Sequence, residues 1–217
     1  MRLMKTVDGQ LVTKVAEHLR SDELHIWRMA YDRHQGREPL RELLAAYLRC
    51  GAQDVQLIES EHGRPELGTA HASPLSFNWS HSGDQAVFAI GIGVQPGIDI
   101  ERLRPRPRAL EIAQRYFDAE EARALESADD EARNLAFLEL WTAKEAVLKA
   151  LGRGLAFGLH RLRIAMHSDR LHLRWLDDDD AQAWQLRRLT LDAVHVGAIA
   201  WRGSPRALWY GTLADRH

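Results

Sequence analysis

Residues 141–155 (WTAKEAVLKALGRGL) constrain the fold of this chain more than any other stretch, because they predict the end of a helix that runs into a glycine turn. From about residue 131 to residue 151, apolar residues recur at spacings of three to five, which is typical of a helix with one face in a core. Gly152 follows the last helical position, where a left-handed cap residue is expected. The sequence therefore predicts a long helix that organises the second part of the chain.

One face of this predicted helix carries an unusual combination of side chains. Trp141, Glu145 and Lys149 are spaced four residues apart, so they lie on the same face. A carboxylate and an ammonium group would then lie beside apolar surface. One interpretation is an ordinary Glu–Lys pair, which stabilises a helix by about 0.2–0.5 kcal/mol. The other interpretation is a functional site, and the helix alone leaves both open.

The overall composition limits the classes of partner. The 217 residues suffice for one large domain or two small ones, and 45% of them are hydrophobic. A net charge of −2 gives no electrostatic reason to expect binding to nucleic acid or to an anionic membrane. The sequence has no run of about 18 apolar residues and, at 1–10, no apolar core of a signal peptide, so we expect no membrane span. The single cysteine, Cys50, excludes an intramolecular disulfide and favours a reduced, cytoplasmic setting.

Short strands grouped after helices indicate the α+β class rather than an alternating α/β fold. Helices are predicted at 40–49, 109–128 and 131–151. Strands are predicted at 55–59, 75–80, 86–94 and 98–101, and an antiparallel group is predicted at 162–166, 171–175, 184–189 and 194–200, with 207–210 at its edge. Residues 102–108 contain four arginines and two prolines without a hydrophobic period, which indicates a linker or a crossing loop. We therefore predict two halves, 1–101 and 102–217.

The strand predicted at 98–101 places two carboxylates on one face. Successive side chains of a strand alternate between faces, so Asp99 and Glu101 point one way and the two isoleucines point the other. Two carboxylates at this spacing can reach a common cation, and Mg²⁺ is commonly held by one or two carboxylates together with phosphate oxygens and water. A strand whose polar face lies in solvent would show the same pattern, so both interpretations stay open.

Two other charged stretches also allow more than one interpretation. The region 28–41 contains Arg28, Arg33, Arg37 and Arg41, which fits either a solvated helix surface or an edge that faces phosphate. Four consecutive aspartates at 177–180 have the oxygen ligands that Ca²⁺ prefers, but their position between two predicted strands favours the solvated tip of a hairpin.

Three segments, taken in order, change the interpretation of the whole chain. They are FNWSHS at 77–82, GIDIE at 97–101 and WTAKEAVLKALGRGL at 141–155. In this order and at this spacing they resemble the 4′-phosphopantetheinyl transferase superfamily, and within it the larger, single-chain Sfp-like class. Gly63-Arg64-Pro65 resembles the Gly-Lys-Pro turn of that class. The resemblance spans roughly residues 59–155 and, more loosely, the whole chain.

The resemblance implies a fold and an activity. The fold is pseudo-dimeric: two similar α+β halves in one chain each pack a small antiparallel sheet with helices, so a monomer suffices. The activity is the Mg²⁺-dependent transfer of the 4′-phosphopantetheine arm of coenzyme A to a serine of an apo acyl, peptidyl or polyketide carrier protein. The by-product is adenosine 3′,5′-bisphosphate. Such carriers serve fatty acid or secondary metabolite biosynthesis, and no residue of this chain identifies which one.

The resemblance also implies roles for individual residues. Asp99, Glu101 and Glu145 are expected to hold Mg²⁺ against the pyrophosphate of coenzyme A. Glu145, or a metal-bound water, is expected to take the proton of the carrier serine, while Lys149 contacts the phosphates and stabilises the leaving group. The residues expected to take part in catalysis are thus Asp99, Glu145 and Lys149. Those expected to bind the nucleotide part of coenzyme A, in the N-terminal half, are Arg64, Pro65, Ser80 and His81.

Two alternative functions would use the same residues. A non-catalytic module that binds coenzyme A or a carrier protein would keep the fold and lose a metal carboxylate, yet all three are present. A Mg²⁺-dependent phosphohydrolase that cleaves coenzyme A would keep all three, and only its products would distinguish it. Arg64 and Arg153 stand where the family more often has lysine, which keeps the charge but offers forked contacts.

Overall fold

The computed structural model describes residues 5–7, 9–167 and 170–214, with the backbone alone at 5–7 and 9–10. The chain forms two compact units, Met1–Pro96 with Pro205–His217, and Gly97–Ser204. These units divide the chain differently from the predicted halves, because the strand after Pro96 pairs within the second unit and the chain returns to the first unit at its end. Along the described ranges, no helix combines the length and the hydropathy that a membrane crossing requires.

A mixed five-stranded sheet with the order β1-β12-β2-β6-β5 lies at the centre of the first unit. Its strands are β1 (Lys5–Val7), β2 (Glu23–Ala30), β5 (Leu75–Ser82), β6 (Gln85–Ile92) and β12 (Ala207–Leu213). β12 pairs in parallel with β1 and β2, whereas β2, β6 and β5 pair antiparallel. Trp209 of β12 packs against Trp27 of β2, with ring centroids 4.8 Å apart. The strand predicted at 207–210 as an edge of the second sheet was therefore wrongly placed, and the first sheet is mixed rather than antiparallel.

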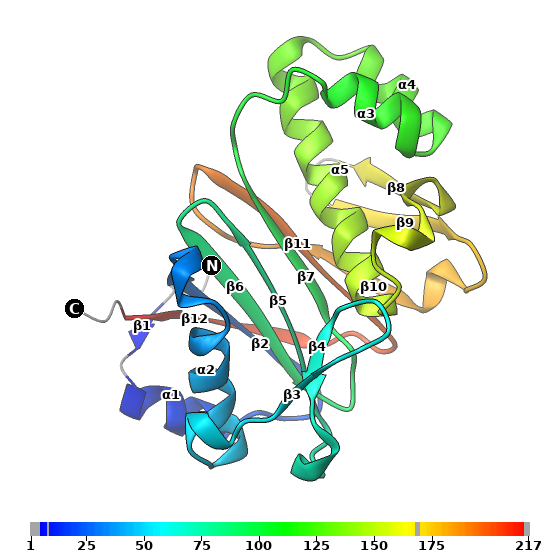
Figure 1. The fold of residues 1–217 in the computed structure, drawn as a ribbon. Coiled ribbons are helices and arrows are strands. Elements are labelled where there is room, and N and C mark those ends of the chain that lie inside the picture. Colours follow the sequence, from blue (N-terminus) through cyan, green and yellow to red (C-terminus); the bar gives the residue numbers. More distant parts are fainter. Residues whose placement is uncertain (1–4, 8, 168–169, 215–217) are drawn as a thin grey trace. The chain divides into compact units, whose positions relative to one another are not determined.

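The helix predicted at 40–49 is α2 (Glu38–Leu48), which lies against one face of this sheet (Figure 1). Pro39 stands in its first turn, where a missing backbone N–H costs nothing, and Arg49 ends it in a left-handed conformation. The buried leucines of α2 join Phe88 of β6 in one hydrophobic core. The other elements of this unit are α1 (Gly9–Ala16) and a hairpin of β3 (Leu57–Glu59) and β4 (Pro65–Leu67).

The second unit contains a three-stranded antiparallel sheet with the order β10-β11-β7. Its strands are β7 (Gly97–Arg102), β10 (Trp184–Arg188) and β11 (His195–Arg202). The unit also contains α3 (Ala109–Tyr116), α4 (Ala119–Glu126), α5 (Asp130–Leu151) and a ribbon of β8 (Leu162–His167) and β9 (Arg170–Leu176). The antiparallel strands predicted after residue 154 are present, although they form two separate sheets. The predicted α+β class is confirmed.

Single turns of 3₁₀ helix connect several of these elements. They are η1 (Arg33–Gln35), η2 (Ala52–Asp54), η3 (Thr69–His71), η4 (Leu155–Phe157), η5 (Leu159–Arg161) and η6 (Ala181–Ala183). Two of them, η4 and η5, follow α5 directly and lead the chain from the helix into β8.

The helix predicted at 131–151 is α5, and local sequence explains both of its ends. Its N-cap, Asp129, accepts a hydrogen bond from the Ala132 N–H at 2.9 Å, and Gly152, with a φ of 71°, ends it. The helix packs against β7 and β11. Gly97 permits a close approach of β7, because a Cβ at this position would lie 1.9 Å from the carbonyl oxygen of Ala146. A glycine at the start of β7 therefore sets the distance between strand and helix.

Candidate active site

The carboxylates predicted on one face of β7 do face α5. Asp99 and Glu101 lie on the same side of the strand as Gly97, whose position abuts the helix. The Lys149 ammonium donates to Asp99 Oδ1 at 2.7 Å and to the carbonyl oxygen of Ile98 at 3.1 Å. Asp99 is buried, whereas the Lys149 side chain is 25% exposed. Strand and helix periodicity thus bring together residues that lie fifty positions apart in the chain.

Glu145 lies one helical turn before Lys149 and is buried. Its Oε1 atom has no hydrogen-bond partner within the described chain. Burial raises the pKa of the Glu145 carboxyl to about 7, and the negative charge of Asp99 contributes to this rise. The Lys149 ammonium lowers the pKa, and the charge of Glu101 raises it. Because Asp99 and Glu101 both act on Glu145, the three carboxylates share one electrostatic environment.

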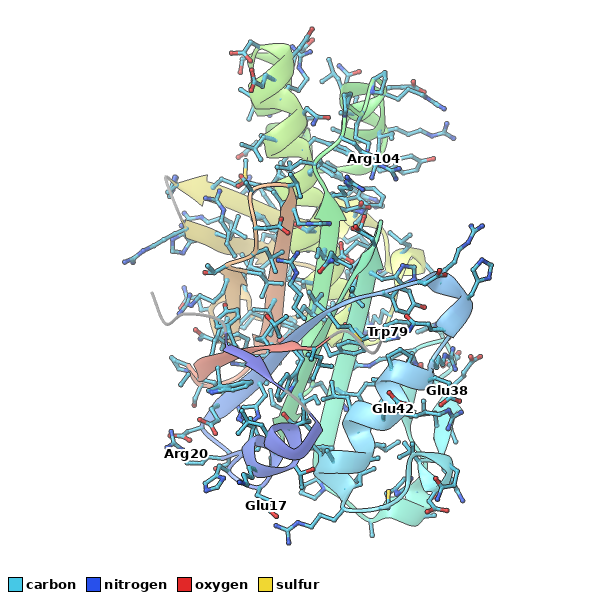
Figure 2. The ribbon with its side chains drawn as sticks, turned by 90° about the vertical axis from the view of Figure 1, so that its left-hand side faces the viewer. Glu17, Arg20, Glu38, Glu42, Trp79 and Arg104 are labelled. Atoms are coloured by element: carbon cyan, nitrogen blue, oxygen red, sulfur yellow. The ribbon has the colours of Figure 1, made fainter. Side chains whose placement is uncertain are left out.

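Glu101 is held by an arginine from the loop that follows β7. The Arg106 Nη2 donates to Glu101 Oε2 at 2.9 Å. Asn134 of α5 ties this loop down, because its Oδ1 accepts from the Arg106 N–H at 2.8 Å and its Nδ2 donates to the Arg104 carbonyl oxygen at 3.2 Å. Arg104 is labelled in Figure 2. The stretch predicted as a linker or crossing loop is therefore a loop fixed to α5.

The donor set of this site suits a hard divalent cation. Among the described residues, no three His, Cys, Asp or Glu side chains are already grouped as metal ligands. Lys149 contacts Asp99, and Arg106 contacts Glu101. The buried Oε1 of Glu145, without a hydrogen-bond partner in the described chain, is an acceptor that a cation would satisfy. Carboxylate oxygens are the ligands that Mg²⁺ prefers. The three carboxylates therefore fit magnesium, with two cationic side chains now neutralising two of them.

Lys144 of α5 forms a buried ion pair that sequence reasoning missed. Its Nζ lies 2.6 Å from Glu121 Oε2 and donates to the carbonyl oxygens of Leu159 at 2.9 Å and Leu162 at 2.6 Å. Glu121 also accepts a hydrogen bond from the Ile164 N–H at 2.7 Å. Burial lowers the pKa of Lys144 and raises that of Glu121, and the attraction between the two groups opposes both shifts. The pair joins α4, α5 and β8 through one polar centre.

The residues predicted to bind the nucleotide belong to the first unit. Ser80 and His81 are successive residues of β5, so they point to opposite faces of its sheet. The His81 ring lies beside Tyr31 and Trp79, with centroid distances of 4.9 and 5.5 Å, while Ser80 is buried. The two residues predicted to act together therefore do not share one face of the strand.

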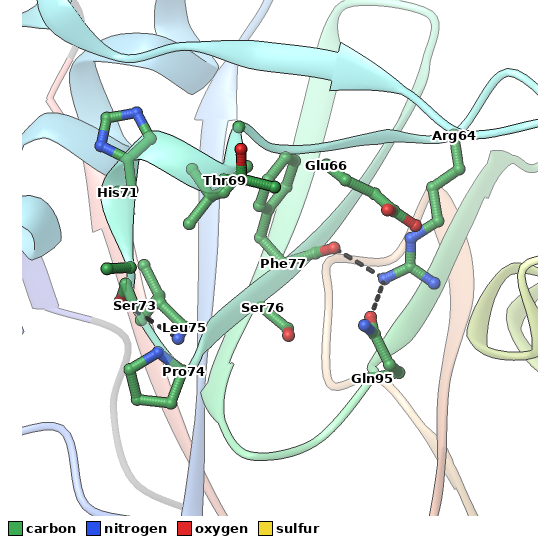
Figure 3. A pocket seen from close by; sticks show the side chains of 13 residues that line it. Arg64, Glu66, Thr69, His71, Ser73, Pro74, Leu75, Ser76, Phe77 and Gln95 are labelled. Atoms are coloured by element: carbon green, nitrogen blue, oxygen red, sulfur yellow. Dashed lines mark hydrogen bonds between the residues drawn. The ribbon is translucent and has the colours of Figure 1, made fainter.

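Arg64 lines a pocket of about 530 Å³ in the first unit, shown in Figure 3. Its guanidinium donates to the Phe77 carbonyl oxygen and to Gln95 Oε1, both at 2.9 Å. It also donates to the Pro96 carbonyl oxygen at 3.2 Å, and burial lowers the pKa of the group. The next residue, Pro65, begins β4. The arginine predicted to bind the nucleotide is thus hydrogen-bonded to backbone and side-chain oxygens at the pocket.

The two ambiguous charged stretches make polar contacts within the protein. In the basic stretch two arginines bind neighbouring side chains, and in the acidic turn arginines bind the aspartates. These contacts include Arg28–Gln85 at 2.7 Å, Arg37–Glu59 at 2.6 Å, Arg161–Asp177 at 2.6 Å and Arg202–Asp179 at 3.0 Å. The acidic turn, predicted to be a solvated tip, is therefore stabilised by guanidinium groups.

Comparison with known proteins identifies the family of this chain. The sequence model of the 4′-phosphopantetheinyl transferase superfamily matches residues 95–200. The 4′-phosphopantetheinyl transferase HetI of Nostoc sp. is 33% identical over 219 residues, which cover 85% of this chain and 90% of HetI. The human L-aminoadipate-semialdehyde dehydrogenase-phosphopantetheinyl transferase is 30% identical over 77% of this chain and 60% of its own length. The chain therefore belongs to the 4′-phosphopantetheinyl transferase superfamily.

Other similar proteins match a smaller part of this chain. A Synechocystis sp. relative is 38% identical over 57% of this chain, and the chain spans only 50% of that relative. The holo-[acyl-carrier-protein] synthase of Thermotoga maritima covers 51% of this chain with a TM-score of 0.41 and 19% identity, over 64% of its own chain. The Bacillus anthracis holo-(acyl-carrier-protein) synthase, solved with CoA (3′,5′-ADP), covers 51% with a TM-score of 0.42 and 16% identity, over 98% of its own chain. The family expected from the ordered motifs is confirmed by the sequence relatives.

Proposed function

We propose that this chain transfers the 4′-phosphopantetheine arm of coenzyme A to a serine of an apo carrier protein and releases adenosine 3′,5′-bisphosphate. The observation that carries this proposal is Glu145, whose buried Oε1 has no hydrogen-bond partner in the described chain and which senses the charges of Asp99 and Glu101. Membership of the superfamily supports the same reaction, because HetI and the human relative are both named phosphopantetheinyl transferases. The reaction centre in this proposal is the face of α5 that meets β7.

Asp99, Glu101 and Glu145 would hold Mg²⁺ at this centre. When bound, the cation supplies positive charge that neutralises the pyrophosphate oxygens during displacement at phosphorus. The carboxylates supply hard, anionic oxygen ligands, and the burial of Asp99 and Glu145 strengthens their attraction for a cation. Lys149 extends the positive charge of the site, since its partly exposed ammonium can donate to phosphate oxygens and to the leaving group.

The transfer step uses Glu145 as the proton acceptor. The serine oxygen forms a bond to the phosphorus that bears the pantetheine arm, and the bond from that phosphorus to the bridging oxygen breaks. The electron pair of the broken bond leaves with adenosine 3′,5′-bisphosphate, and the serine proton passes to the Glu145 carboxylate. The buried Oε1 of Glu145 supports this role, because it has no hydrogen-bond partner in the described chain and is an acceptor available to a proton.

Residues of the first unit would bind the nucleotide part of coenzyme A. The pocket beside Arg64, at about 530 Å³, falls within the range of roughly 300–1,000 Å³ that is usual for small-molecule sites. Pro65 follows directly in the same turn. Ser80 and His81 remain the candidates for the phosphates, and because they point to opposite faces of β5 we expect only one of them to contact a given phosphate group.

The protein partner in this proposal is an acyl, peptidyl or polyketide carrier. Its docking surface would include residues 102–108 and 119–130, which are exposed over much of their length and follow the carboxylate strand in the second unit. A net charge of −2 gives no reason to add a nucleic acid or a membrane as partner. We expect a cytoplasmic monomer that acts in fatty acid or secondary metabolite biosynthesis.

Mass spectrometry of a panel of apo carrier proteins tests the proposal directly. Each carrier is incubated with coenzyme A, Mg²⁺ and this protein. A gain of about 340 Da, the mass of the phosphopantetheine arm, on any carrier supports the transferase and reports carrier preference. Release of adenosine 3′,5′-bisphosphate without a mass gain would indicate the phosphohydrolase instead. Tight binding of coenzyme A with neither product would indicate the non-catalytic module.

A further inference from the structure

The contact between Arg106 and Glu101 places a guanidinium group beside one of the three carboxylates. The Nη2–Oε2 distance is 2.9 Å, and the two side chains are 28% and 21% exposed. Within the described chain the Arg106 guanidinium has no other hydrogen-bond partner. Arginine carries five N–H donors in a planar fork. Most of its hydrogen-bonding capacity is therefore available beside the carboxylate.

The backbone around Arg106 is fixed on both sides. Its N–H donates to Asn134 Oδ1 at 2.8 Å, and its carbonyl oxygen accepts from the Ala109 N–H at 2.8 Å. It lies between Pro105 and Pro107, which limits the backbone conformations of this loop. Because the main chain is held, a change of environment would move the side chain alone. The loop thus presents one long cationic side chain at a defined point of the site.

A divalent cation and the Arg106 guanidinium would compete for Glu101. Both carry positive charge, so binding of the cation to the Glu101 carboxylate weakens the attraction that now holds the arginine. A pyrophosphate group brought to the same cation would offer the guanidinium new anionic oxygens. Arginine is well matched to such a group, since its fork donates two parallel hydrogen bonds to phosphate oxygens.

We propose that Arg106 is a phosphate-binding residue of this site: its guanidinium neutralises Glu101 before the divalent cation binds, and contacts the pyrophosphate of coenzyme A once Glu101 holds the cation. This inference rests on the proposed function, because it takes coenzyme A as the substrate. Arg106 thereby differs from Lys149, which comes from α5 and holds Asp99.

The variant Arg106→Gln tests this proposal with two binding measurements that do not need a carrier protein. Without coenzyme A, Mn²⁺ binding followed by electron paramagnetic resonance should tighten about threefold to tenfold, because a competing charge beside Glu101 is gone. With Mn²⁺ saturating, coenzyme A binding measured by calorimetry should weaken about tenfold to a hundredfold, the usual effect of losing charged hydrogen bonds. Opposite changes in the two constants are the expected signature.

Arg108→Gln is the matched control for the loss of one charge from the same loop. Arg108 is 73% exposed in its side chain and pairs with Glu111 at 2.6 Å. Surface ion pairs of this kind contribute little, so both binding constants should stay within about twofold of the wild type.

Three results would overturn the assignment of Arg106. Weakening of both constants would give it a structural role in orienting Glu101. Unchanged constants would exclude it from the phosphate site, and tighter Mn²⁺ binding with unchanged coenzyme A binding would limit its role to neutralising Glu101. A wild-type protein that binds neither Mn²⁺ nor coenzyme A would instead overturn the proposed function, so the two failures are distinguishable.

Discussion

Lys144 and Lys149 lie on successive turns of α5, yet their surroundings differ in kind. Lys144 is fully buried, and its ammonium contacts the Glu121 carboxylate and two backbone oxygens. Lys149 keeps a quarter of its side chain exposed and contacts Asp99. Every charged group at the first lysine is paired. Beside the second, Oε1 of Glu145 is buried with no hydrogen-bond partner in the described chain.

We interpret this difference as the one between a structural ion pair and the proposed metal site. Buried polar atoms are nearly always hydrogen-bonded, because leaving one unsatisfied costs about 1–3 kcal/mol. The face of α5 that carries Lys144 meets this rule and joins α4 to β8. The face that carries Glu145 violates it, at the point where three carboxylates share one environment. A fold tolerates such a violation at a functional site, where binding supplies the missing partner.

The variant Glu145→Gln should have the largest effect, which is a loss of transfer activity. We expect kcat/KM for transfer to fall about 10²–10⁴-fold, because the amide accepts no proton from the serine. The free energy of unfolding should stay equal or rise, since the change removes a buried negative charge that Asp99 and Glu101 repel. Glu131→Gln, an exposed position in the first turn of the same helix, is the control and should match the wild type. Near wild-type turnover of Glu145→Gln would exclude Glu145 as the base.

The variant Lys144→Met should lower the stability of the protein instead. It leaves Glu121 buried without its cation, which we expect to lower the free energy of unfolding by about 3–5 kcal/mol in urea titrations. Lys149→Met sharpens the contrast, because Mg²⁺ should restore the stability that this second variant loses, whereas Lys144→Met should gain no more from Mg²⁺ than the wild type does. Equal recovery of both variants by Mg²⁺ would show that the two lysines serve the same site.

Adding Glu121→Gln to Lys144→Met separates the cost of charge from the cost of packing. The double variant no longer buries an ion without a partner, so it should recover about 1–3 kcal/mol of the stability lost in the single variant. Urea titration of the two proteins under the same conditions gives this difference. A double variant as unstable as the single one would place the cost in packing around the Lys144 methylenes.

Gly97→Ala tests whether the two faces depend on one helix–strand distance. The new Cβ would lie 1.9 Å from the Ala146 carbonyl oxygen and 2.4 Å from the Ala150 nitrogen, so α5 must move away from β7. Overpacking of this kind costs about 1–3 kcal/mol, and transfer should slow because Glu145 moves relative to Asp99. Melting temperature and transfer rate measure the two effects. Unchanged values for both would show that the site tolerates a wider gap.

Much of the site could be predicted because its residues follow the regular periods of one strand and one helix. Alternation placed Asp99 and Glu101 on one face, and the four-residue spacing placed Glu145 and Lys149 on another. The glycine that ends α5, Gly152, was also predicted correctly from the sequence. Each of these inferences uses only residues that are close in the chain, where the backbone geometry alone determines in which direction a side chain points. The pairing of the two faces with each other came from the family resemblance.

Contacts between distant segments could not be predicted from such local periods. The partner of Lys144 is a glutamate of another helix, and the only local signal was the capping sequence 118–121 at the start of α4, which places Glu121 in the first turn. The arginine that holds Glu101 lies in a loop without any period. The parallel pairing of β12 with β2 brings the C-terminal strand back into the first unit. The predicted halves, each one continuous stretch of chain, did not include this return.

The smallest expected effect concerns the first unit, where the buried His25 joins neutral hydrogen-bond donors to the carboxylate of Glu23. The Trp27 indole N–H donates to the Tyr47 hydroxyl at 2.7 Å, and the same hydroxyl is hydrogen-bonded to His25 Nδ1, also at 2.7 Å. His25 Nε2 then donates to Glu23 Oε1 at 3.3 Å. Here a buried polar centre is satisfied by neutral donors, whereas the one at Lys144 uses an ion pair.

Burial lowers the pKa of His25, although the hydrogen bond with Glu23 opposes this shift. Since the unfolded chain binds the proton more readily, the stability contributed by His25 is fully present above the unfolded pKa of about 6.5 and is lost as the pH falls through the lower folded value. The melting temperature of the wild type should therefore fall between about pH 7 and pH 5, and that of His25→Phe should fall less. The exposed His18, replaced in the same way, should keep the wild-type slope. If His25→Phe kept that slope as well, protonation of His25 would be excluded as the cause of the lower melting temperature in acid.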